Sequence, residues 1–171
     1  MADPLEQIDI VDEDDIVLYS TTKQEAHAQG LLHRCVIGLV INSNGDHVLV
    51  KQASDRQDAG QYVSPVGGHV KAGESPEDAL RRETEEEIGL KEISFRLKGK
   101  GIFNREVLGR KENHYFILYE IDSDEEFIPG VEVESYKIFP IHELKRLRKE
   151  NPKVFGDAHH NIMQTFYKEL L

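Results

Sequence analysis

Hydrophobic and polar residues alternate with a period of two along several stretches of this chain, which predicts β-strands separated by turns. Residues 6–12 and 15–20 alternate around a short acidic segment and therefore predict a hairpin. Residues 34–41 and 47–51 predict two more strands, joined by residues 42–45, where an Asn-Gly pair is a strong turn signal. Four later strands are expected over residues 62–66, 92–105, 113–121 and 131–139.

A helical pattern with clear ends lies in the middle of the chain. Ser75 can cap its N-terminus, Pro76 suits the first helical position, and Asp78 closes a capping box. Gly89 is a helix stop. Between these ends, one stripe of the helix is expected to contact the core. It consists of Leu80, Thr84 and Ile88.

Shorter helix signals flank the predicted strands. Residues 22–25 form a capping box that opens a short helix ending at Gly30. After the last strand, one helix is expected from Pro140 to about residue 150, and a final helix is expected to start at an Asp157 cap and run to the C-terminus. Strands on both sides of one central helix, followed by terminal helices, predict an α/β fold with a mixed sheet between helices.

Three glutamates share one face of the predicted central helix. Glu83, Glu86 and Glu87 stand at positions i, i+3 and i+4, which a rotation of about 100° per residue brings together. Their carboxylates repel one another. A hard divalent cation such as Mg²⁺ or Mn²⁺, which prefers oxygen ligands, would relieve that repulsion. Most glutamate runs are solvated acidic faces. The residues around this run therefore determine whether it is such a face or a metal site.

The surrounding residues follow a known spacing. Residues 68–90 read GHVKAGESPEDALRRETEEEIGL. They resemble the Nudix box, G-x5-E-x7-R-E-U-x-E-E-x-G-U with U aliphatic, at every fixed polar and glycine position, including Gly68, Glu74 and Arg82. Only Thr84 departs, because it replaces an aliphatic residue. The resemblance implies a Nudix-type α/β/α sandwich with a mixed β-sheet.

The same resemblance implies a metal site and a hydrolytic reaction. The implied metal ligands are the carbonyl of Gly67 and the carboxylates of Glu83, Glu86 and Glu87. Members of the family often carry a further carboxylate on a later strand or loop, and Glu112 is the candidate here. The expected catalytic set is therefore Glu83, Glu86, Glu87 and Glu112, and the general base stays open among Glu83, Glu87 and Glu112.

Candidate substrate contacts lie on both sides of the box. Gly68 allows close backbone approach to a ligand, and His69 flanks the expected site. Arg34 and Arg105 are candidates to hold phosphate. Tyr115 could stack on a base or fill the core.

A second resemblance concerns the N-terminal region, which is similar to isopentenyl-diphosphate isomerases. Those enzymes carry a metal-binding histidine that His69 matches, and His27 and His33 lie in similar positions. Gly67 stands where they have a catalytic cysteine, and His114 stands where they have the second of two glutamates. Isomerisation is therefore disfavoured, and the roles of His27, His33 and His114 stay open. A non-catalytic nucleotide-binding Nudix sensor is the other alternative, which the complete set of box acids disfavours.

The composition fits one globular domain over residues 1–171, of which 39% are hydrophobic. An N-terminal extension (1–33), a Nudix core (34–139) and C-terminal helices (140–171) are expected. The net charge of −11 argues against binding to nucleic acid or to an anionic membrane, and no apolar run is long enough to predict a membrane span. The one cysteine, Cys35, excludes an intramolecular disulfide and indicates the reducing cytoplasm.

The sequence thus predicts a cytoplasmic hydrolase that depends on Mg²⁺ or Mn²⁺. Its expected partner is a small-molecule diphosphate, either a nucleoside diphosphate linked to another group or a related organic diphosphate. Water would attack one phosphorus while the bound metal neutralises the diphosphate oxygens. A homodimer is compatible with the sequence, and the identity of the substrate is left open.

Overall fold

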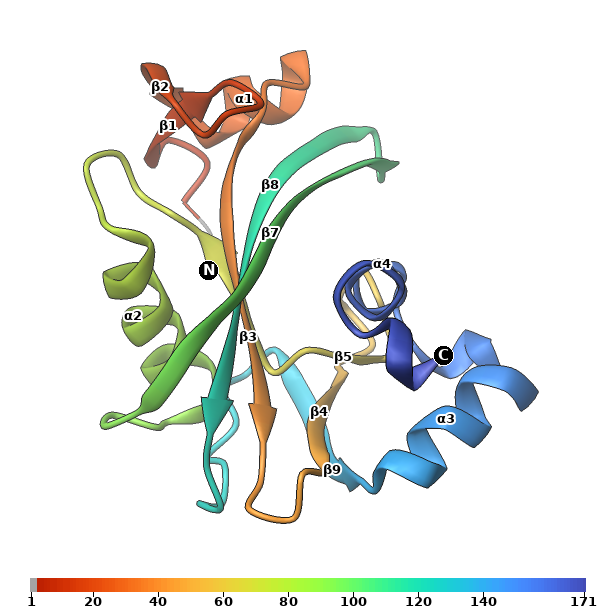
Figure 1. Cartoon of the computed structure of the whole chain (residues 1–171). Helices are drawn as coiled ribbons and strands as arrows, with labels where there is room; N and C mark the ends of the chain where they lie inside the picture. The colour runs from red at the N-terminus through yellow and green to blue at the C-terminus, as the bar shows by residue number, and fades with distance from the viewer. Residues whose placement is uncertain (1–2) are drawn as a thin grey trace.

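The computed structural model describes residues 3–171, in which one mixed nine-stranded sheet carries helices on both of its faces (Figure 1). The strands are β1 (Gln7–Val11), β2 (Val17–Thr22), β3 (His33–Ile41), β4 (His47–Gln52), β5 (Tyr62–Val63), β6 (Val66–His69), β7 (Ser94–Val107), β8 (Arg110–Asp122) and β9 (Val133–Phe139). The helices are α1 (Lys23–Gln29), α2 (Pro76–Ile88), α3 (Ile141–Glu150) and α4 (Asp157–Phe166), with 3₁₀ turns at Pro152–Val154 and Lys168–Leu170. Within residues 3–171, none of the helices has the length and apolar character that a membrane crossing requires.

Strand β3 is the centre of the sheet. It pairs in parallel with β8 and antiparallel with β1, β4 and β6. Val36 and Val40 enter the core on the α2 side, whereas Ile37 and Leu39 enter the core on the side of α3 and α4 (Figure 1). Both faces of β3 are therefore buried, which explains why its sequence is a nearly continuous apolar run. The layers confirm the predicted α/β/α sandwich with a mixed sheet.

The sheet opens between β3 and β4. These two strands pair only near their connecting turn, where Val40 faces Val48 and the next residues also pair. Farther along, β4 pairs with β5 and β3 pairs with β6. The single strand predicted over residues 62–66 is therefore wrong, because the segment divides into two strands that join different neighbours. Pro65 lies in the interruption, and proline has no backbone N–H to continue a ladder.

The predicted ends of the central helix α2 are confirmed. Ser75 Oγ accepts a hydrogen bond of 3.1 Å from the backbone N–H of Asp78, and Gly89 ends the helix with a φ of 75°, which glycine adopts without steric cost. Thr22 and Gly30 cap α1 in the same way. The stripe predicted to contact the core is fully buried, and it consists of Leu80, Thr84 and Ile88.

The last helix differs from its prediction at both ends. Gly156 occupies the N-cap position of α4, so Asp157 is the first helical residue, and no side chain of the described region closes this cap. Asp157 still places a negative charge in the first turn, where the helix dipole favours it. The helix stops at Phe166 and is followed by a 3₁₀ turn, so it does not continue to the C-terminus.

Candidate active site

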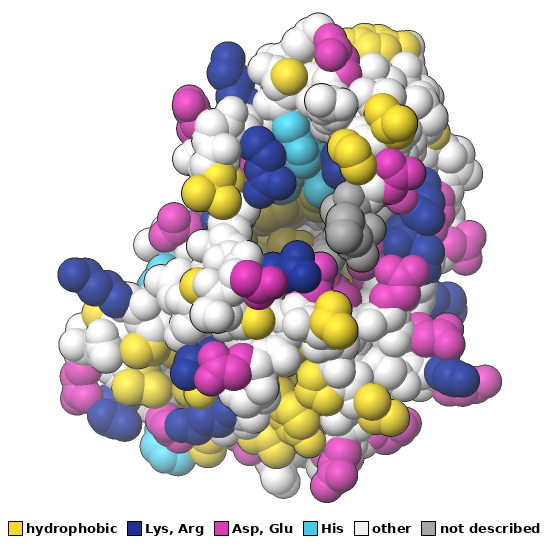
Figure 2. Space-filling view, turned by 180° about the vertical axis from the view of Figure 1, so that it is seen from behind, with side chains coloured by type: hydrophobic (Ala, Val, Ile, Leu, Met, Phe, Trp, Pro, Cys, Tyr) yellow, Lys and Arg dark blue, Asp and Glu magenta, His cyan; other side chains and the backbone are white. Residues whose placement is uncertain are grey.

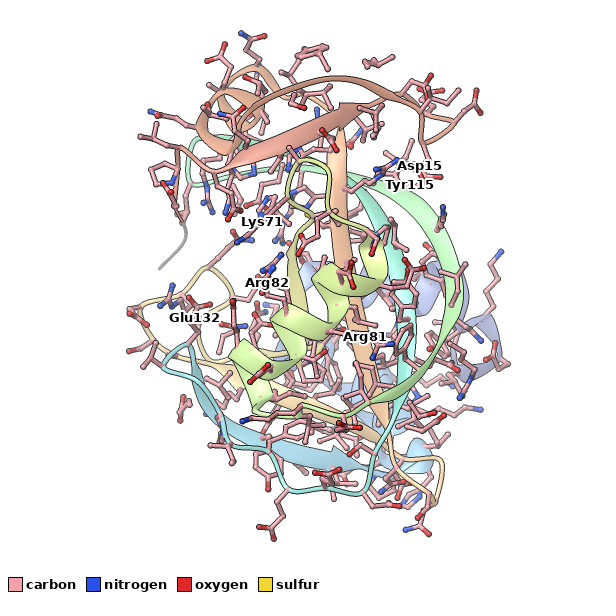
Figure 3. The ribbon with its side chains drawn as sticks, turned by 90° about the vertical axis from the view of Figure 1, so that its left-hand side faces the viewer. Asp15, Lys71, Arg81, Arg82, Tyr115 and Glu132 are labelled. Atoms are coloured by element: carbon pink, nitrogen blue, oxygen red, sulfur yellow. The ribbon has the colours of Figure 1, made fainter. Side chains whose placement is uncertain are left out.

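Glu83, Glu86 and Glu87 of α2 line a cavity of about 400 Å³ together with residues 67–69 of β6. We call it the acidic cavity, and its lining includes Gly67, Gly68, His69, Arg82, Glu83, Glu86, Glu87 and Glu132. Arg82, Lys71 and Glu132 lie around this cavity in Figure 3. Figure 2 shows a hollow on the face opposite that of Figure 1, with histidine and charged side chains around it. The antiparallel pairing of β6 with β3 fixes the floor of the cavity against the centre of the sheet.

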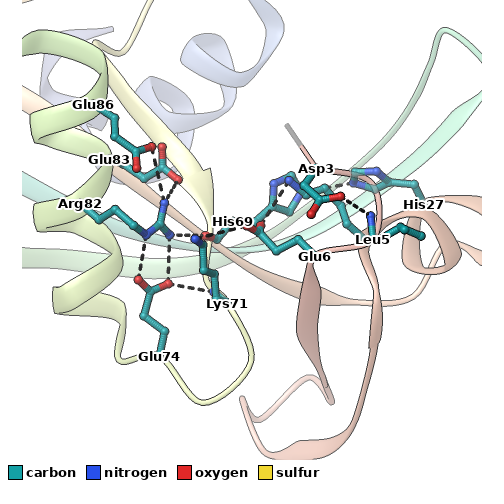
Figure 4. Close-up of polar contacts among 11 residues, drawn as sticks. Asp3, Leu5, Glu6, His27, His69, Lys71, Glu74, Arg82, Glu83 and Glu86 are labelled. Carbon is teal, nitrogen blue, oxygen red and sulfur yellow. Dashed lines mark hydrogen bonds and ion pairs between the residues drawn. The ribbon is translucent and has the colours of Figure 1, made fainter. Parts of the chain in front are cut away.

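Arg82 connects the loop that precedes α2 to the helix itself (Figure 4). Its Nε and Nη2 atoms donate hydrogen bonds of 2.9 and 3.0 Å to the two carboxylate oxygens of Glu74. The Nη2 atom also donates to the carbonyl of His69 at 3.1 Å, and Nη1 donates to Glu83 at 2.5 Å. Burial would raise the pKa of Glu74, but the hydrogen bonds from Arg82 and from the backbone N–H of Lys71 outweigh it, so the pKa is lowered. The arginine therefore holds the loop and the helix in one arrangement.

Glu87 lies deeper in the protein than Glu83 and Glu86. One of its carboxylate oxygens accepts a hydrogen bond of 2.8 Å from the backbone N–H of Gly67. Burial raises the pKa of Glu87 well above its ordinary range despite that hydrogen bond, and the charges of Glu83, Glu132 and Glu86 raise it further. The carboxylate thus lies in a region where negative charge is costly and positive charge would be stabilised.

Glu83 and Glu86 differ in their surroundings. Burial raises the pKa of Glu83, and Arg82 only partly opposes this effect. Gly68 packs so closely against Glu83 that a Cβ atom at residue 68 would overlap the Glu83 carboxylate. The Glu86 side chain is 61% exposed, and its carboxylate lies 3.8 Å from Arg82. The cavity therefore has one exposed carboxylate and two that the protein holds in place.

A second cavity, of about 310 Å³, meets the acidic cavity at β6. We call it the apolar cavity, because Cys35, Ile37, Val50, Val63, Phe116 and Ile162 form much of its wall. Its polar lining includes Arg56, Asp58, Arg105, Glu112 and His114. The two cavities share Gly67, Gly68, His69, Glu87, Glu132 and Val133. They are therefore neighbouring lobes, and residues 67–69 form the seam between them.

Glu112 and Arg105 lie on the wall of the apolar cavity as a buried ion pair. Arg105 Nε donates to Glu112 at 2.9 Å, and Arg110 Nη2 approaches the same carboxylate at 3.1 Å. Arg105 also lies 3.9 Å from Asp58, whose pKa burial raises. The structure thus brings two predicted residues, Arg105 and Glu112, to the site from neighbouring strands.

Arg34 and Tyr115, which the sequence predicted as substrate contacts, line neither cavity as residues 3–171 define them. They are neighbours in the parallel register of β3 and β8, on the faces of these strands that look away from the apolar cavity. Arg34 donates to Asp15 at 2.5 Å, and Tyr115 packs against the core beneath α2. Neither cavity therefore supports substrate contact by Arg34 or Tyr115, and that contact stays a prediction. Residues next to them in sequence, such as Phe116, face the cavity instead.

Several lining residues were not singled out from the sequence. Arg56 and Asp58 come from the polar loop after β4, and Glu132 comes from the segment before β9. Cys35 also lines the apolar cavity, where burial raises the pKa of its thiol. These residues carry no local motif, and only the tertiary fold brings them beside the box.

Comparisons with known proteins agree with this architecture. Residues 31–158 match the family model of the NUDIX domain. An uncharacterized Nudix hydrolase of Nostoc sp. is 32% identical over 167 residues, which cover 89% of this chain and 91% of that protein. An isopentenyl-diphosphate delta-isomerase of Pectobacterium atrosepticum is 28% identical over 161 residues, covering 89% of this chain and 86% of the isomerase.

A solved structure supports the same fold. The crystal structure of DR0079 from Deinococcus radiodurans superposes with a TM-score of 0.75 at 20% identity, covering 94% of this chain and 99% of that one. The family model covers most of the chain, and residues 68–90 keep every fixed polar and glycine position of the box. The chain therefore belongs to the Nudix hydrolase family.

Proposed function

We propose that this protein hydrolyses the diphosphate linkage of a nucleoside diphosphate joined to another group, or of a related organic diphosphate, with Mg²⁺ or Mn²⁺ as cofactor. One observation carries the proposal. The acidic cavity and the apolar cavity meet at residues 67–69, so the carboxylates proposed to bind the metal lie directly beside the space proposed for an organic group. A diphosphate that bridges the two lobes would have its phosphorus atoms at that seam.

The residues of the acidic cavity fit a hard divalent cation. Glu83, Glu86 and Glu87 offer carboxylate oxygens, and the carbonyl of Gly67 is the proposed fourth donor. Burial and the neighbouring carboxylates make a negative charge on Glu87 costly, and a cation beside it would offset that cost. Such a cation, when bound, neutralises diphosphate oxygens and lowers the pKa of the attacking water.

The chain itself has three further tasks in this reaction. Arg82 keeps Glu83 in place through its 2.5 Å contact and holds the loop through Glu74. A carboxylate must accept a proton from the attacking water. Glu83, Glu87 and Glu112 remain the alternatives for this base, and the pH profiles of their glutamine variants would separate them.

The apolar cavity is the proposed place for the group attached to the diphosphate. Its volume of about 310 Å³ lies at the lower end of the range for small-molecule sites. Val50, Val63 and Phe116 provide apolar surface. Arg56 and Arg105 place guanidinium groups on its wall, where they pair with Glu132 and Glu112, and such groups are suited to binding phosphate. We therefore propose His69, Gly68 and Arg105 as substrate contacts.

A panel of diphosphates tests the proposal. Phosphate or phosphate-ester release would be measured from nucleotide sugars, dinucleoside polyphosphates, nucleoside triphosphates and prenyl diphosphates, with Mg²⁺ or Mn²⁺ and with excess chelator. Turnover that needs the metal and is lost in Glu86→Gln is the expected result. Binding of a nucleotide without turnover of any compound would instead identify a non-catalytic sensor.

The single buried cysteine supports a cytoplasmic location. Whether the protein forms a homodimer would be tested by light scattering.

A further inference from the structure

Two side chains on the wall of the apolar cavity have hydrogen-bonding atoms that the protein does not use. Ser64 Oγ and both ring nitrogens of His159 are buried and have no hydrogen-bond partner among residues 3–171. Both residues line the apolar cavity. Buried polar atoms are nearly always paired, so unused atoms on one cavity wall indicate a ligand that supplies their partners.

His159 lies near the start of α4 and is only 1% exposed. Its ring packs at a tilt against that of Phe155, with 5.3 Å between the ring centroids, and Ala158 and Ile162 of the same helix also line the cavity. Burial lowers the pKa of His159 to about 3, and the charge of Arg148 lowers it further, so the imidazole is neutral. A neutral imidazole has one donor and one acceptor, and neither is used within the described part of the chain.

Ser64 lies in the interruption between β5 and β6, and its hydroxyl can both donate and accept a hydrogen bond. The backbone N–H of Gly156 donates a 3.0 Å hydrogen bond to the carbonyl of Tyr62, which holds the start of α4 against β5 (Figure 1). A Cβ atom at residue 156 would lie only 2.8 Å from the Val63 side chain, so glycine permits this close approach. The fold therefore keeps Ser64 and His159 on neighbouring elements of the cavity wall.

The organic group that fits this wall must combine apolar surface with donors and acceptors. Val50, Val63 and Phe116 form apolar parts of the wall. A prenyl chain would cover them but leave Ser64 and His159 without partners. A nucleobase offers both, because its ring has a flat apolar face and an edge of donors and acceptors. A site whose buried groups hydrogen-bond their ligand discriminates strongly against an analogue that lacks the matching groups.

We propose that Ser64 and His159 hydrogen-bond the organic group of the substrate and so select a nucleoside diphosphate derivative over a prenyl diphosphate. This inference rests on the proposed function, because it concerns the organic group of the same substrate. Ser64 and His159 do not line the acidic cavity as residues 3–171 define it. They would therefore act on binding and not on the cleavage of the diphosphate.

A binding experiment without turnover tests this selection. AMP, GMP, CMP, UMP and dimethylallyl monophosphate would each be titrated into the protein with Mg²⁺ and followed by calorimetry. Each compound carries one phosphate group, so differences in affinity report on the organic group. At least one nucleotide should bind about 10-fold or more tightly than dimethylallyl monophosphate. Equal or tighter binding of dimethylallyl monophosphate, or no measurable binding of any nucleotide, would overturn the proposal.

Variants then assign the preference to the two residues. Ser64→Ala and His159→Leu should each reduce the preference for the nucleotide over dimethylallyl monophosphate by about 10-fold or more, because each removes hydrogen-bonding groups. Ser94→Ala and His142→Leu change exposed residues of the same two types, so they are matched controls and should keep the wild-type preference. A purely structural role would weaken the binding of both compounds alike and leave their ratio unchanged.

His159→Gln supplies a rescue, since a glutamine side chain also offers donors and an acceptor. It should retain more of the preference than His159→Leu. Ser64→Ala carries the test if thermal melts show that the His159 variants do not fold. An unchanged ratio in every folded variant of Ser64 and His159 would refute the recognition. Glu86→Gln should lose hydrolysis but keep the nucleotide preference, and that preference without turnover of any diphosphate would contradict only the proposed hydrolysis.

Discussion

The backbone N–H of Gly67 donates a 2.8 Å hydrogen bond to the Glu87 carboxylate, so the last turns of α2 are fastened to the strand that forms the seam between the two cavities. Glu87 is consequently held at the point where both lobes meet.

Glu86→Gln and Glu87→Gln should each lower kcat by about 10² or more, because each removes a charge that the proposed metal needs. Folding should be little affected. Glu86 is largely exposed, and removing the buried negative charge of Glu87 relieves repulsion from Glu83 and Glu132. Steady-state kinetics and thermal melts in chelator would check both points. Near-normal kcat in both variants would refute the assigned site.

Gly68→Ala should abolish most activity while leaving a folded protein. A Cβ atom at residue 68 would overlap the Glu83 carboxylate and lie 2.7 Å from its Cγ, so the Glu83 side chain must move away from Arg82. Gly67→Ala is the matched control for stability, because its Cβ would meet only the Val36 carbonyl at 3.9 Å. If Gly68→Ala retained wild-type kcat, the position of Glu83 would not matter for the reaction.

Glu74→Gln should destabilise the fold by about 1–3 kcal/mol at pH 7, because Glu74 accepts charge-assisted hydrogen bonds from partly buried Arg82. The pKa of Glu74 is lowered in the folded state, so this stabilisation is present above the unfolded pKa near 4.5 and is lost as the pH falls through the folded value. Urea unfolding at several pH values would therefore show the variant and the wild type converging in acid.

The matched control for that series is Glu150→Gln, which breaks an exposed pair with Arg146 on α3. Exposed pairs of this kind contribute little, so a change within about 0.5 kcal/mol is expected. A gap between Glu74→Gln and the wild type that stayed constant down to pH 3 would contradict the assigned cause.

Mg²⁺ or Mn²⁺ should raise the melting temperature of the protein, because a ligand that binds only the folded state stabilises it. Ca²⁺ should support little turnover, since it is larger and tolerates looser geometry than Mg²⁺. A metal series in thermal-shift and activity assays would check this. Full activity in excess chelator would exclude the metal-dependent mechanism.

The protein should not interconvert isopentenyl and dimethylallyl diphosphate, despite its similarity to an isomerase. That reaction adds one proton and removes another, so it needs two positioned acid–base groups. Gly67 offers no side-chain proton, and His114 stands where the isomerases have the second of two glutamates. NMR of prenyl diphosphate in deuterated buffer would decide the question, and metal-dependent deuterium incorporation at a catalytic rate would contradict the prediction.

The parts of the site that depend on local signals were predictable from the sequence. Ser75 and Gly89 set the ends of α2 through interactions within one turn. The spacing of Glu83, Glu86 and Glu87 places them on one helix face wherever the helix docks. The break at Pro65 was less clear, because the preceding residues alternate like a single strand and only the choice of partner strands divides them.

Contacts between distant strands were not predictable in the same way. Strand alternation separates Arg34 from His33 and Tyr115 from His114, so it distinguishes the two faces of β3 and β8 but not which face holds the cavity. The meeting of His27, His33, His69 and His114 depends on the parallel register of β3 with β8 and on the docking of α1. Neither of these has a signal within a short window of sequence.

The opening of the sheet between β3 and β4 separates the elements that carry the carboxylates from the elements that form the facing wall of the apolar cavity. The carboxylates lie on α2 beside β6, and β6 pairs with β3. On the facing wall, Val50, Val63 and Val133 belong to β4, β5 and β9. Few backbone hydrogen bonds join β3 to β4, so the two parts are held together mainly by the core beneath α2, to which Val50, Val63 and Val133 also belong. A substitution that changes the shape of the wall therefore also changes the packing under α2, so the space offered to a ligand and the placement of the carboxylates are coupled.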